Sequence, residues 1–421
     1  MAHPVDAPRA AALTLLMGVT EDHRLLSELL PRVMAPLAAA DRARAQRLAT
    51  GTLRWMDRAD RALGPFLRMK PWPRTHNAMR LAIYELFVEG AAEHGVVNAA
   101  VDLVRAMPDT APQAGLANAV LRNVIRQGGW DALPLPRLPK WLRKPLTDDF
   151  GKARVEAMEA AFARMPPLDL TPRDGDAATL AALLGGIALP TGSVRLTETG
   201  QISALPGFDT GAWWVQDAAA ALPARLLKAQ PGERVLDLCA APGGKTMQLA
   251  ATGAHVTALD NSEPRMQRLR ENLARTKLVA ETVVADALTY AVETPFDAVL
   301  LDAPCSATGT IRRHPDLPRA KDGSDFPALI KLQEQMIDAA LRLVKPGGRL
   351  IFCTCSLLID EGEEQVRDAL ARHPGLRIEP LDHPTIEDHW RTPEGLRLTP
   401  DLWPGTGHLD GFFITCLRRP S

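Results

Sequence analysis

Two cysteines of the sequence follow apolar segments that are typical of β-strands. Cys305 comes directly after DAVLLDAP (297–304), and Cys355 lies near the end of RLIFCTCS (349–356). In a doubly wound sheet of parallel strands, these two strands are neighbours, and ligands bind in the crevice outside their carboxyl ends. We therefore predict that both thiols face one ligand crevice. A buried cysteine is usually only a small apolar side chain, and we expect that role for Cys239, Cys353 and Cys416.

A thiol beside a ligand crevice can act as a nucleophile. C5 of a cytosine is a poor nucleophile, but addition of a thiolate to C6 makes C5 enamine-like and able to take a methyl group from a sulfonium. A base must then remove the C5 proton, and nearby cations or helix N-termini must help the thiol to ionise. Asp302, just before Cys305, would accept a hydrogen bond from N4 of the base. The pattern therefore predicts covalent catalysis on a pyrimidine.

A glycine-rich loop, DLCAAPGGKT (237–246), follows another predicted strand, and three ligand classes compete for it. Its last residues, Gly244-Lys245-Thr246, resemble a phosphate-binding P-loop, and DAVLLDAP resembles the acidic strand of such ATPases, but the P-loop needs a glycine where Cys239 stands. The GxGxxG spacing of dinucleotide-binding folds is absent. S-adenosylmethionine has no phosphates and needs fewer backbone amides, so the loop favours this ligand.

Two carboxylates agree with an S-adenosylmethionine site. Such a site needs an acidic residue at the end of the second strand for the ribose hydroxyls, where Asp260 stands. It also needs a polar residue at the end of the third strand, near the adenine, where Asp286 stands. An aspartate after a strand is often only a helix cap. The glycine loop and the two carboxylates in this order nevertheless favour the cofactor.

Alternating strands and helices would position these residues. The predicted strands are followed or separated by helical stretches such as 264–276 and 329–344, which is typical of an α/β Rossmann-like domain with a parallel, doubly wound sheet. We expect this domain to span 216–421. Its predicted strands are 234–240, 255–260, 281–286, 297–304, 349–356 and the final GFFITCLRR (411–419).

The N-terminal third is predicted to be an all-α domain, 1–135. Apolar residues recur at helical spacing, and further helical patterns cover 76–87, 95–107 and 113–127, the last ending at Gly128-Gly129. A linker, LPLPRLPK (133–140), follows in a stretch with four prolines between 134 and 145, and short helical and strand-like pieces such as GSVRLTET (192–199) are expected in 141–215. We therefore expect 136–215 to hold the linker and a small α/β subdomain. The helical spacing is carried by Ala45, Leu48, Ala49 and Leu53.

Composition excludes several classes of protein. A chain of 421 residues exceeds one core and predicts two or three domains. It has no apolar run of about 20 residues and begins with a helix-like segment rather than a signal peptide, so we expect no membrane contact. Five cysteines without CxxC spacing indicate free thiols in a cytoplasmic protein that binds no metal. Residues 1–140 hold 18 Lys and Arg against 13 Asp and Glu, an excess that suits RNA phosphates or merely solvated helices.

The motifs together resemble those of a known family. DLCAAPGGKT (237–246), LLDAPCSATGTIRRHPD (300–316), LVKPGGRLIFCTCSL (343–357) and DGFF (410–413) resemble the RsmB/Nop2/NSUN family of RNA cytosine-C5 methyltransferases, and the bacterial RsmB (Sun/Fmu) branch in particular. The N-terminal region is similar to the NusB-like domain of that branch and is expected to bind RNA, so the resemblance covers nearly the whole chain. The N-terminal segments that resemble this domain are RAQRLATGTLR, RLAIYELF, VVNAAVDLVR and GLANAVLRNV.

The resemblance implies a function and a set of site residues. It implies methylation of a 16S rRNA cytosine by a protein that we expect to be a monomer, with Cys355 as nucleophile and Cys305 assisting release of the product. Asp302 would touch both the base and the cofactor, and Lys245 would lie between cofactor and substrate. The S-adenosylmethionine site would comprise Cys239, Ala240, Ala241, Pro242, Gly243, Gly244, Lys245, Asp260, Asp286 and Asp302.

Some residues depart from the family pattern or leave alternatives open. The segment 320–327 does not match the family pattern beyond RRHPD, although Arg312 and Arg313 suit RNA phosphates. Cys353, on the same face of its strand as Cys355, is an alternative nucleophile. A tRNA or another RNA is an alternative substrate, and a non-catalytic NusB-like RNA-binding protein is an alternative to the enzyme.

Overall fold

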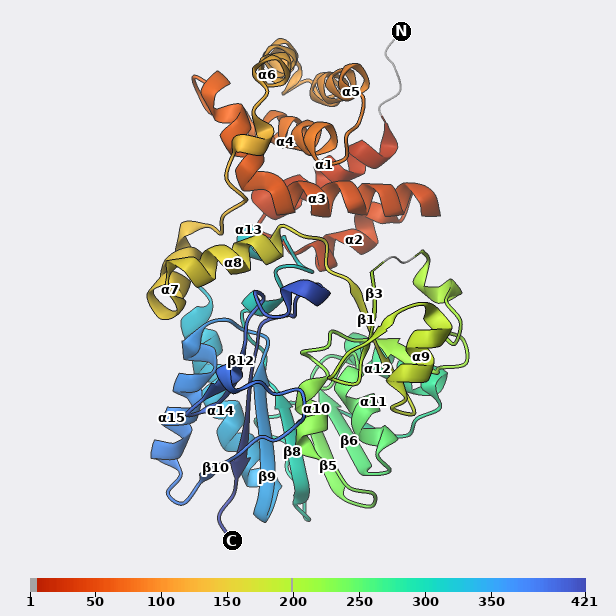
Figure 1. Cartoon of the computed structure of the whole chain (residues 1–421), viewed down its shortest axis with the longest axis vertical. Helices are drawn as coiled ribbons and strands as arrows, with labels where there is room; N and C mark the ends of the chain where they lie inside the picture. The colour runs from red at the N-terminus through yellow and green to blue at the C-terminus, as the bar shows by residue number, and fades with distance from the viewer. Residues whose placement is uncertain (1–5, 198–199) are drawn as a thin grey trace. The chain divides into compact units, whose positions relative to one another are not determined.

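The computed structural model describes residues 6–197 and 200–421, and the chain divides into two compact units. One unit contains the residues up to Met165 together with Ile311–Ser324, and the other contains Pro166–Thr310 together with Asp325–Ser421. The first unit is helical and the second is built on β-sheets (Figure 1). The boundaries at 135 and 215 stay predictions, because compactness alone does not define a domain.

Amphipathic helices build the first unit around one apolar core. The residues predicted at helical spacing are buried on α3 (Ala39–Leu63), where Gly51 lets α4 (Pro73–Phe87) approach, since a Cβ there would lie 2.0 Å from Cζ of Tyr84. α6 (Ala114–Gln127) ends where predicted, because Gly128 has a φ of 64°. The remaining helices are α1 (Ala7–Thr20), α2 (Leu26–Met34), α5 (Glu93–Arg105), α7 (Lys140–Phe150), α8 (Lys152–Phe162) and α13 (Leu317–Ala320).

The segment LPLPRLPK (133–140), predicted as a linker, lies outside helices and strands except for its last residue. Residues 133–139 lie outside helices and strands, but α7 begins at Lys140 and contains Pro145. Proline in a helix removes one backbone hydrogen bond, and burial of Leu142 and Leu146 on the same helix offsets that loss. Pro145, the fourth proline of this stretch, therefore lies in a helix and not in the linker, which agrees with the short helical pieces expected in 141–215.

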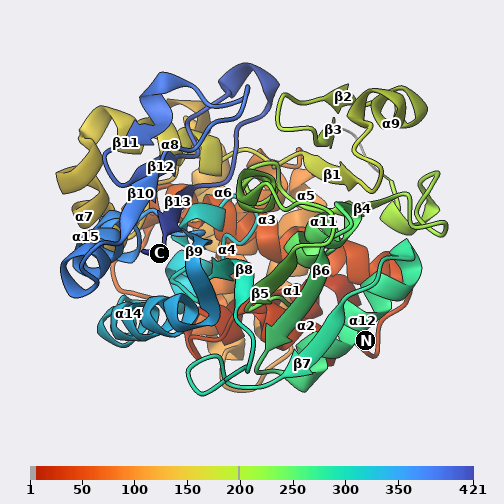
Figure 2. The same cartoon turned by 90° about the horizontal axis from the view of Figure 1, so that it is seen from below.

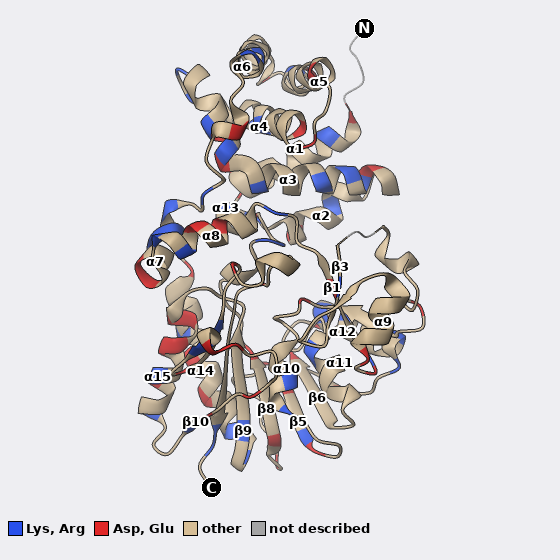
Figure 3. Cartoon of the chain, in the orientation of Figure 1, with Lys and Arg blue, Asp and Glu red and all other residues tan. Residues whose placement is uncertain are grey.

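Much of the arginine excess of the helical unit serves its own packing. Lys and Arg recur along α3 (Figure 3). Arg9 forms an ion pair of 2.7 Å with the buried Glu85. Arg58 donates to the carbonyl of Trp130, and its guanidinium lies 4.6 Å from the centre of that indole ring. The basic composition alone is therefore a weak indicator of RNA contact.

The second unit contains a nine-stranded sheet in the order β11-β12-β13-β9-β8-β5-β6-β7, with β10 beside β13 (Figure 2). The strands β5 to β9 run parallel, and β13 is antiparallel to β9. The strand order reverses between β5 and β8, which is where open α/β sheets bind ligands. The strands are β5 (Arg234–Leu238), β6 (His255–Asp260), β7 (Glu281–Val284), β8 (Phe296–Asp302), β9 (Val344–Thr354), β10 (Arg377–Glu379), β11 (Arg391–Thr392), β12 (Gly395–Leu398) and β13 (Phe412–Arg418).

Helices cover both faces of this sheet, which confirms the predicted doubly wound fold. Alternate side chains of β9 enter two cores, with Ile351 and Cys353 on one face and Leu350 and Phe352 on the other. The first core includes α10 (Leu222–Leu227) and α11 (Gly244–Ala251), and the second includes α14 (Phe326–Leu343) and α15 (Glu363–Arg372). α12 (Glu263–Thr276) packs against β6 and β7.

A smaller, four-stranded antiparallel sheet precedes β5 in the chain. It has the order β2-β3-β1-β4 and is fixed by a fully buried ion pair of 2.7 Å between Arg195 and Asp169. The predicted strand-like segment GSVRLTET includes β3, but its Glu198 and Thr199 lie outside the described residues. The elements are β1 (Leu168–Pro172), α9 (Ala177–Leu184), β2 (Ile187–Ala188), β3 (Val194–Leu196) and β4 (Trp213–Val215).

Candidate active site

The ends of β8 and β9 bring the two predicted thiols together. The strands pair in parallel with Asp302 opposite Cys353, and beyond them Ala303 N donates to Cys353 O and Gly309 N to Cys355 O. These bonds keep the two loops side by side after the regular ladder has ended. The Sγ atoms of Cys305 and Cys355 lie 3.5 Å apart.

The surroundings of the cysteines separate them into classes. Burial raises the pKa of Cys239 and of Cys416 to about 12. The hydrogen bond with Cys355, and then burial, raise the pKa of Cys305 well above its usual value. Cys353 is fully buried with its Sγ 3.4 Å from Oδ1 of Asp302, and burial followed by that carboxylate raises its pKa in the same direction. A thiol that stays protonated is a poor nucleophile, so this geometry disfavours Cys353.

Lys245 places a fixed cation at the same edge of the sheet. Its Nζ donates to Oδ2 of Asp302 over 2.7 Å and lies 5.3 Å from the centre of the Phe412 ring. Burial, the largest single influence, would lower the pKa of Lys245, but Asp302, Cys353 and Asp237 together outweigh burial and the pKa is raised. Lys245 therefore remains an ammonium that holds the Asp302 side chain in place.

The glycine-rich loop turns sharply between β5 and α11. Gly243 adopts a φ of 103°, and a Cβ there would lie 2.9 Å from the side chain of Leu269. Thr246 Oγ1 donates to Oδ2 of the buried Asp237 over 2.6 Å, and burial raises the pKa of that carboxyl to about 7. Oδ2 of Asp260 accepts from Ala241 N over 3.2 Å. The loop is thus held by Asp237 of β5 and by Asp260 of β6.

A cavity of about 870 Å³ brings most of the predicted site residues together. Asp286 reaches it from the turn after β7, where its carboxylate accepts from Leu288 N, and Asp260 reaches it from the end of β6. The apolar part of its wall, Leu259, Leu332 and Met336, was not predicted, because the residue type alone does not distinguish an apolar residue that lines a cavity from one in the core. The predicted residues on its wall are Cys239, Ala241, Asp260, Asp286, Asp302, Cys305 and Cys355.

A second cavity, of about 950 Å³, holds other predicted residues. It shares Cys239, Ala241 and Asp302 with the first, so the glycine-rich loop and the end of β8 form a wall common to both. Gln216 and Asp217 also line it and were missed, although their pattern QDAAA directly follows β4. Gly243 lines neither cavity and acts through the turn of the loop. The other predicted residues on its wall are Ala240, Pro242, Gly244 and Lys245.

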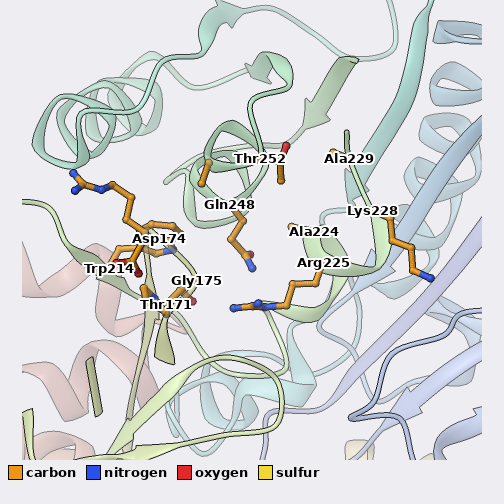
Figure 4. Close-up of a pocket in the computed structure, with 13 residues that line it drawn as sticks. Thr171, Asp174, Gly175, Trp214, Ala224, Arg225, Lys228, Ala229, Gln248 and Thr252 are labelled. Carbon is orange, nitrogen blue, oxygen red and sulfur yellow. The ribbon is translucent and has the colours of Figure 1, made fainter. Parts of the chain in front are cut away.

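A third hollow, of about 630 Å³, lies between the small sheet, α10 and α11 (Figure 4). Trp214, Arg225 and Gln248 converge on it, and none of its lining residues is a cysteine. It therefore offers no nucleophile for the predicted chemistry.

Across the described part of the chain, no group of three or more His, Cys, Asp or Glu could hold a metal ion.

Comparison with known proteins decides the family. A family model described as 16S rRNA methyltransferase RsmB/F matches residues 224–418, and a model of the NusB family matches residues 6–126. The Ribosomal RNA small subunit methyltransferase B of Pseudomonas putida is 38% identical over 98% of this chain and 98% of its own length. The chain belongs to the RsmB/F family of 16S rRNA methyltransferases. The resemblance stated from the motifs is confirmed, and this RsmB/F-family chain is neither a P-loop ATPase nor a non-catalytic protein.

Solved structures show the same fold. The crystal structure of a protein named PH0851 matches 100% of both chains with a TM-score of 0.74 at 23% identity. The structure of NSun6 from Pyrococcus horikoshii with SFG has a TM-score of 0.58 at 20% identity and covers 67% of this chain and 98% of that chain. These matches support the combination of a helical N-terminal part and a Rossmann-like methyltransferase domain.

S-adenosylmethionine is the cofactor of RsmB/F-family enzymes, and the first cavity fits it. Asp260, Asp286 and Asp302 line this cavity, and carboxylates suit hydroxyl groups and a cationic sulfonium. The same carboxylates would repel the phosphates of ATP. Leu259, Leu288 and Met336 supply an apolar wall for a planar base.

Among the residues that the structure describes, no helix has the length and apolar character of a membrane span.

Proposed function

We propose that this enzyme methylates C5 of a specific cytosine in 16S rRNA through a covalent bond between Sγ of Cys355 and C6 of the base. One observation carries the proposal: two thiols lie 3.5 Å apart on the wall of the cavity that Asp260 and Asp286 also line. Methylation of an oxygen or an exocyclic nitrogen requires no thiol, because those atoms are already nucleophilic.

Cys355 carries the covalent steps in this proposal. Its thiolate adds to C6, which forms the S–C6 bond and moves the C5–C6 electron pair to C5. C5 would then bond to the methyl group of bound S-adenosylmethionine as the bond between that methyl and the sulfonium sulfur breaks, which leaves S-adenosylhomocysteine. Loss of the C5 proton to a base then re-forms the C5–C6 double bond while the S–C6 bond breaks, and Cys355 leaves as a thiolate.

Cys305 assists the release of the product. Its raised pKa keeps it a thiol at neutral pH, so it holds a proton 3.5 Å from the leaving sulfur. A hydrogen bond from Cys305 to the departing thiolate stabilises the leaving group. This role explains why the site contains two thiols rather than one.

Asp302 and Lys245 position the base. The side chain of Asp302 is 32% exposed and is held by Lys245 on one oxygen and by Cys353 on the other. A carboxylate oxygen carries two lone pairs, so Asp302 retains acceptor capacity for N4–H of a cytosine. The ion pair with Lys245 fixes the position of this acceptor.

The decisive experiment identifies the modified atom. We would incubate the purified full-length protein with methyl-labelled S-adenosylmethionine and either 16S rRNA, alone or in small subunits, or bulk tRNA, and map 5-methylcytosine by bisulfite sequencing. The proposal expects one protected cytosine in 16S rRNA. Label in tRNA alone would refute the rRNA substrate, and label in rRNA without a bisulfite-protected cytosine would refute methylation at C5.

One chain supplies both thiols and the whole cavity wall, and we propose that a monomer acts on the RNA. A light-scattering mass during turnover would test this. A dimer mass for the active species would contradict it.

A further inference from the structure

Beneath the two thiols lies a cluster of buried hydroxyl groups. Ser306 follows Cys305 in the chain and Ser356 follows Cys355, and both serines are fully buried. Their Oγ atoms lie 3.1 Å apart although the residues are separated by 50 positions, and Oγ1 of Thr308 lies 3.2 Å from each. A hydrogen bond therefore joins Ser306, the residue after Cys305, to Ser356, the residue after Cys355.

The carboxylate of Glu361 accepts hydrogen bonds from this cluster. Its side chain is fully buried. One carboxylate oxygen accepts from the backbone N–H of Ser306 over 2.9 Å and the other accepts from the hydroxyl of Ser306. Gln333 Nε2 donates to Glu361 over 2.9 Å and also to the carbonyl of Pro304, the residue before Cys305. Glu361 thus fixes the Cys305 loop on both sides of the thiol.

The same residue also holds the other loop. The backbone carbonyl of Glu361 accepts from Oγ1 of Thr354, the residue before Cys355, over 2.9 Å. Ser356, the residue after Cys355, reaches Glu361 through the hydroxyl of Ser306. In the part of the chain that the structure describes, no cation forms an ion pair with Glu361, so its carboxylate is satisfied by the groups that bracket the thiols.

We propose that Glu361 is a positioning residue that sets the separation of the two thiols, acting through Ser306 on the Cys305 loop and through Ser356 on the Cys355 loop. The inference deepens the proposed function and rests on it for its catalytic meaning. A displacement of about 1 Å can cost about 100-fold in rate, so a carboxylate that fixes both loops controls a distance on which release depends. A negative charge on Glu361 also contributes, after the Cys355 hydrogen bond and burial, to the raised pKa of Cys305.

The test measures thiol separation apart from catalysis. Full-length Glu361→Gln, Ser306→Ala and the double variant would react with dibromobimane, which fluoresces when it has alkylated two neighbouring thiols, and peptide mapping would identify the Cys305–Cys355 product. We expect each single variant to slow this product about 10-fold or more. The double variant should be no slower than the slower single variant, because both changes break one chain of bonds.

The matched control is Glu233→Gln. The Glu233 carboxylate is also held by several donors, Arg349 and the N–H of Gln230, but it precedes β5 at the opposite end of the strands. We expect this variant to cross-link at the wild-type rate. With RNA as substrate, Glu361→Gln should lower kcat about 10-fold or more and leave KM unchanged. The concentration of active sites is measured by trapping the covalent adduct, and kcat is calculated per active site. A smaller fraction of folded protein would then leave kcat unchanged.

Each outcome decides the proposal. Wild-type cross-linking and kcat in folded Glu361→Gln would overturn it and leave Glu361 a purely structural residue. If Glu361→Gln does not fold, Ser306→Ala decides alone, and a wild-type cross-linking rate in that variant would overturn the proposal. The two proposals can also fail separately. If the variants cross-link slowly but the wild-type enzyme methylates no cytosine, Glu361 remains a positioning residue and only the proposed function is refuted.

Discussion

Strand β8 carries an aspartate–lysine pair at each of its two ends, and the pairs differ in their surroundings. Near its amino end, Asp297 pairs with Lys345, whose side chain is 50% exposed. At its carboxyl end, Asp302 pairs with Lys245, whose side chain is 10% exposed. Water screens the first pair, whereas in the second pair Asp302 lines two cavities and Lys245 lines one of them. Identical residue types therefore form a surface contact or part of a site according to the edge of the sheet that they occupy.

The largest effect at the carboxyl end is expected from Cys355→Ala. Loss of the nucleophile should lower kcat about 10⁴-fold or more and abolish any covalent complex with RNA that contains 5-fluorocytidine, whose C5 holds no proton to remove. Gel shifts under denaturing conditions and methyl-label incorporation measure the two effects. An adduct that persists in Cys355→Ala and disappears in Cys353→Ala would transfer the nucleophilic role to Cys353.

Cys305→Ala should separate formation of the adduct from its release. Without the neighbouring thiol, 3.5 Å away, the Cys355 adduct should form but resolve slowly, so turnover falls about 100-fold or more while a protein–RNA complex accumulates on denaturing gels with unmodified RNA. The Cys305→Ala, Cys355→Ala double variant is the control and should form no complex. Rapid release from Cys305→Ala would assign the second thiol no part in turnover.

Lys245→Met tests the buried pair directly. Removal of the ammonium leaves the Asp302 carboxylate without its cation and held less firmly, so we expect kcat to fall about 100-fold. Lys345→Met is the matched control, because it makes the same substitution in the pair at the other end of β8. Equal losses of kcat in steady-state methylation by both variants would erase the distinction between the two ends.

Lys345→Met should have the smallest effect, and only on stability. An exposed pair contributes about 1 kcal/mol or less to the free energy of unfolding. The hydrogen bond from Lys345 lowers the pKa of Asp297, so this contribution is present above the ordinary aspartate pKa of about 3.9 and is lost as pH falls through the lowered value. The difference in urea midpoint between variant and wild type should shrink between about pH 5 and pH 3. A difference that grows on acidification would contradict the prediction.

Local patterns in the sequence predict most of the parallel sheet. β6 (His255–Asp260) agrees with its predicted bounds, and β8 and β9 are neighbours as expected. Such strands are buried on both faces and therefore appear as continuous apolar runs. The expectation that Arg312 meets RNA phosphates is wrong, because its side chain is only 1% exposed. Whether a charged side chain is buried depends on packing between distant segments, which no local pattern records.

The amino-acid sequence by itself determined the family, the fold class, the cofactor and the candidate thiols, because glycine loops, strand-end carboxylates and cysteine motifs are short and have fixed spacing. Only the tertiary structure decided that Cys353 is held beside Asp302 and that Cys305 meets Cys355. It also distinguished Glu361, which is buried, from its exposed neighbour Asp360 in one acidic run. The physical reason is that burial and long-range hydrogen bonds arise when segments separated by 50 positions are brought together.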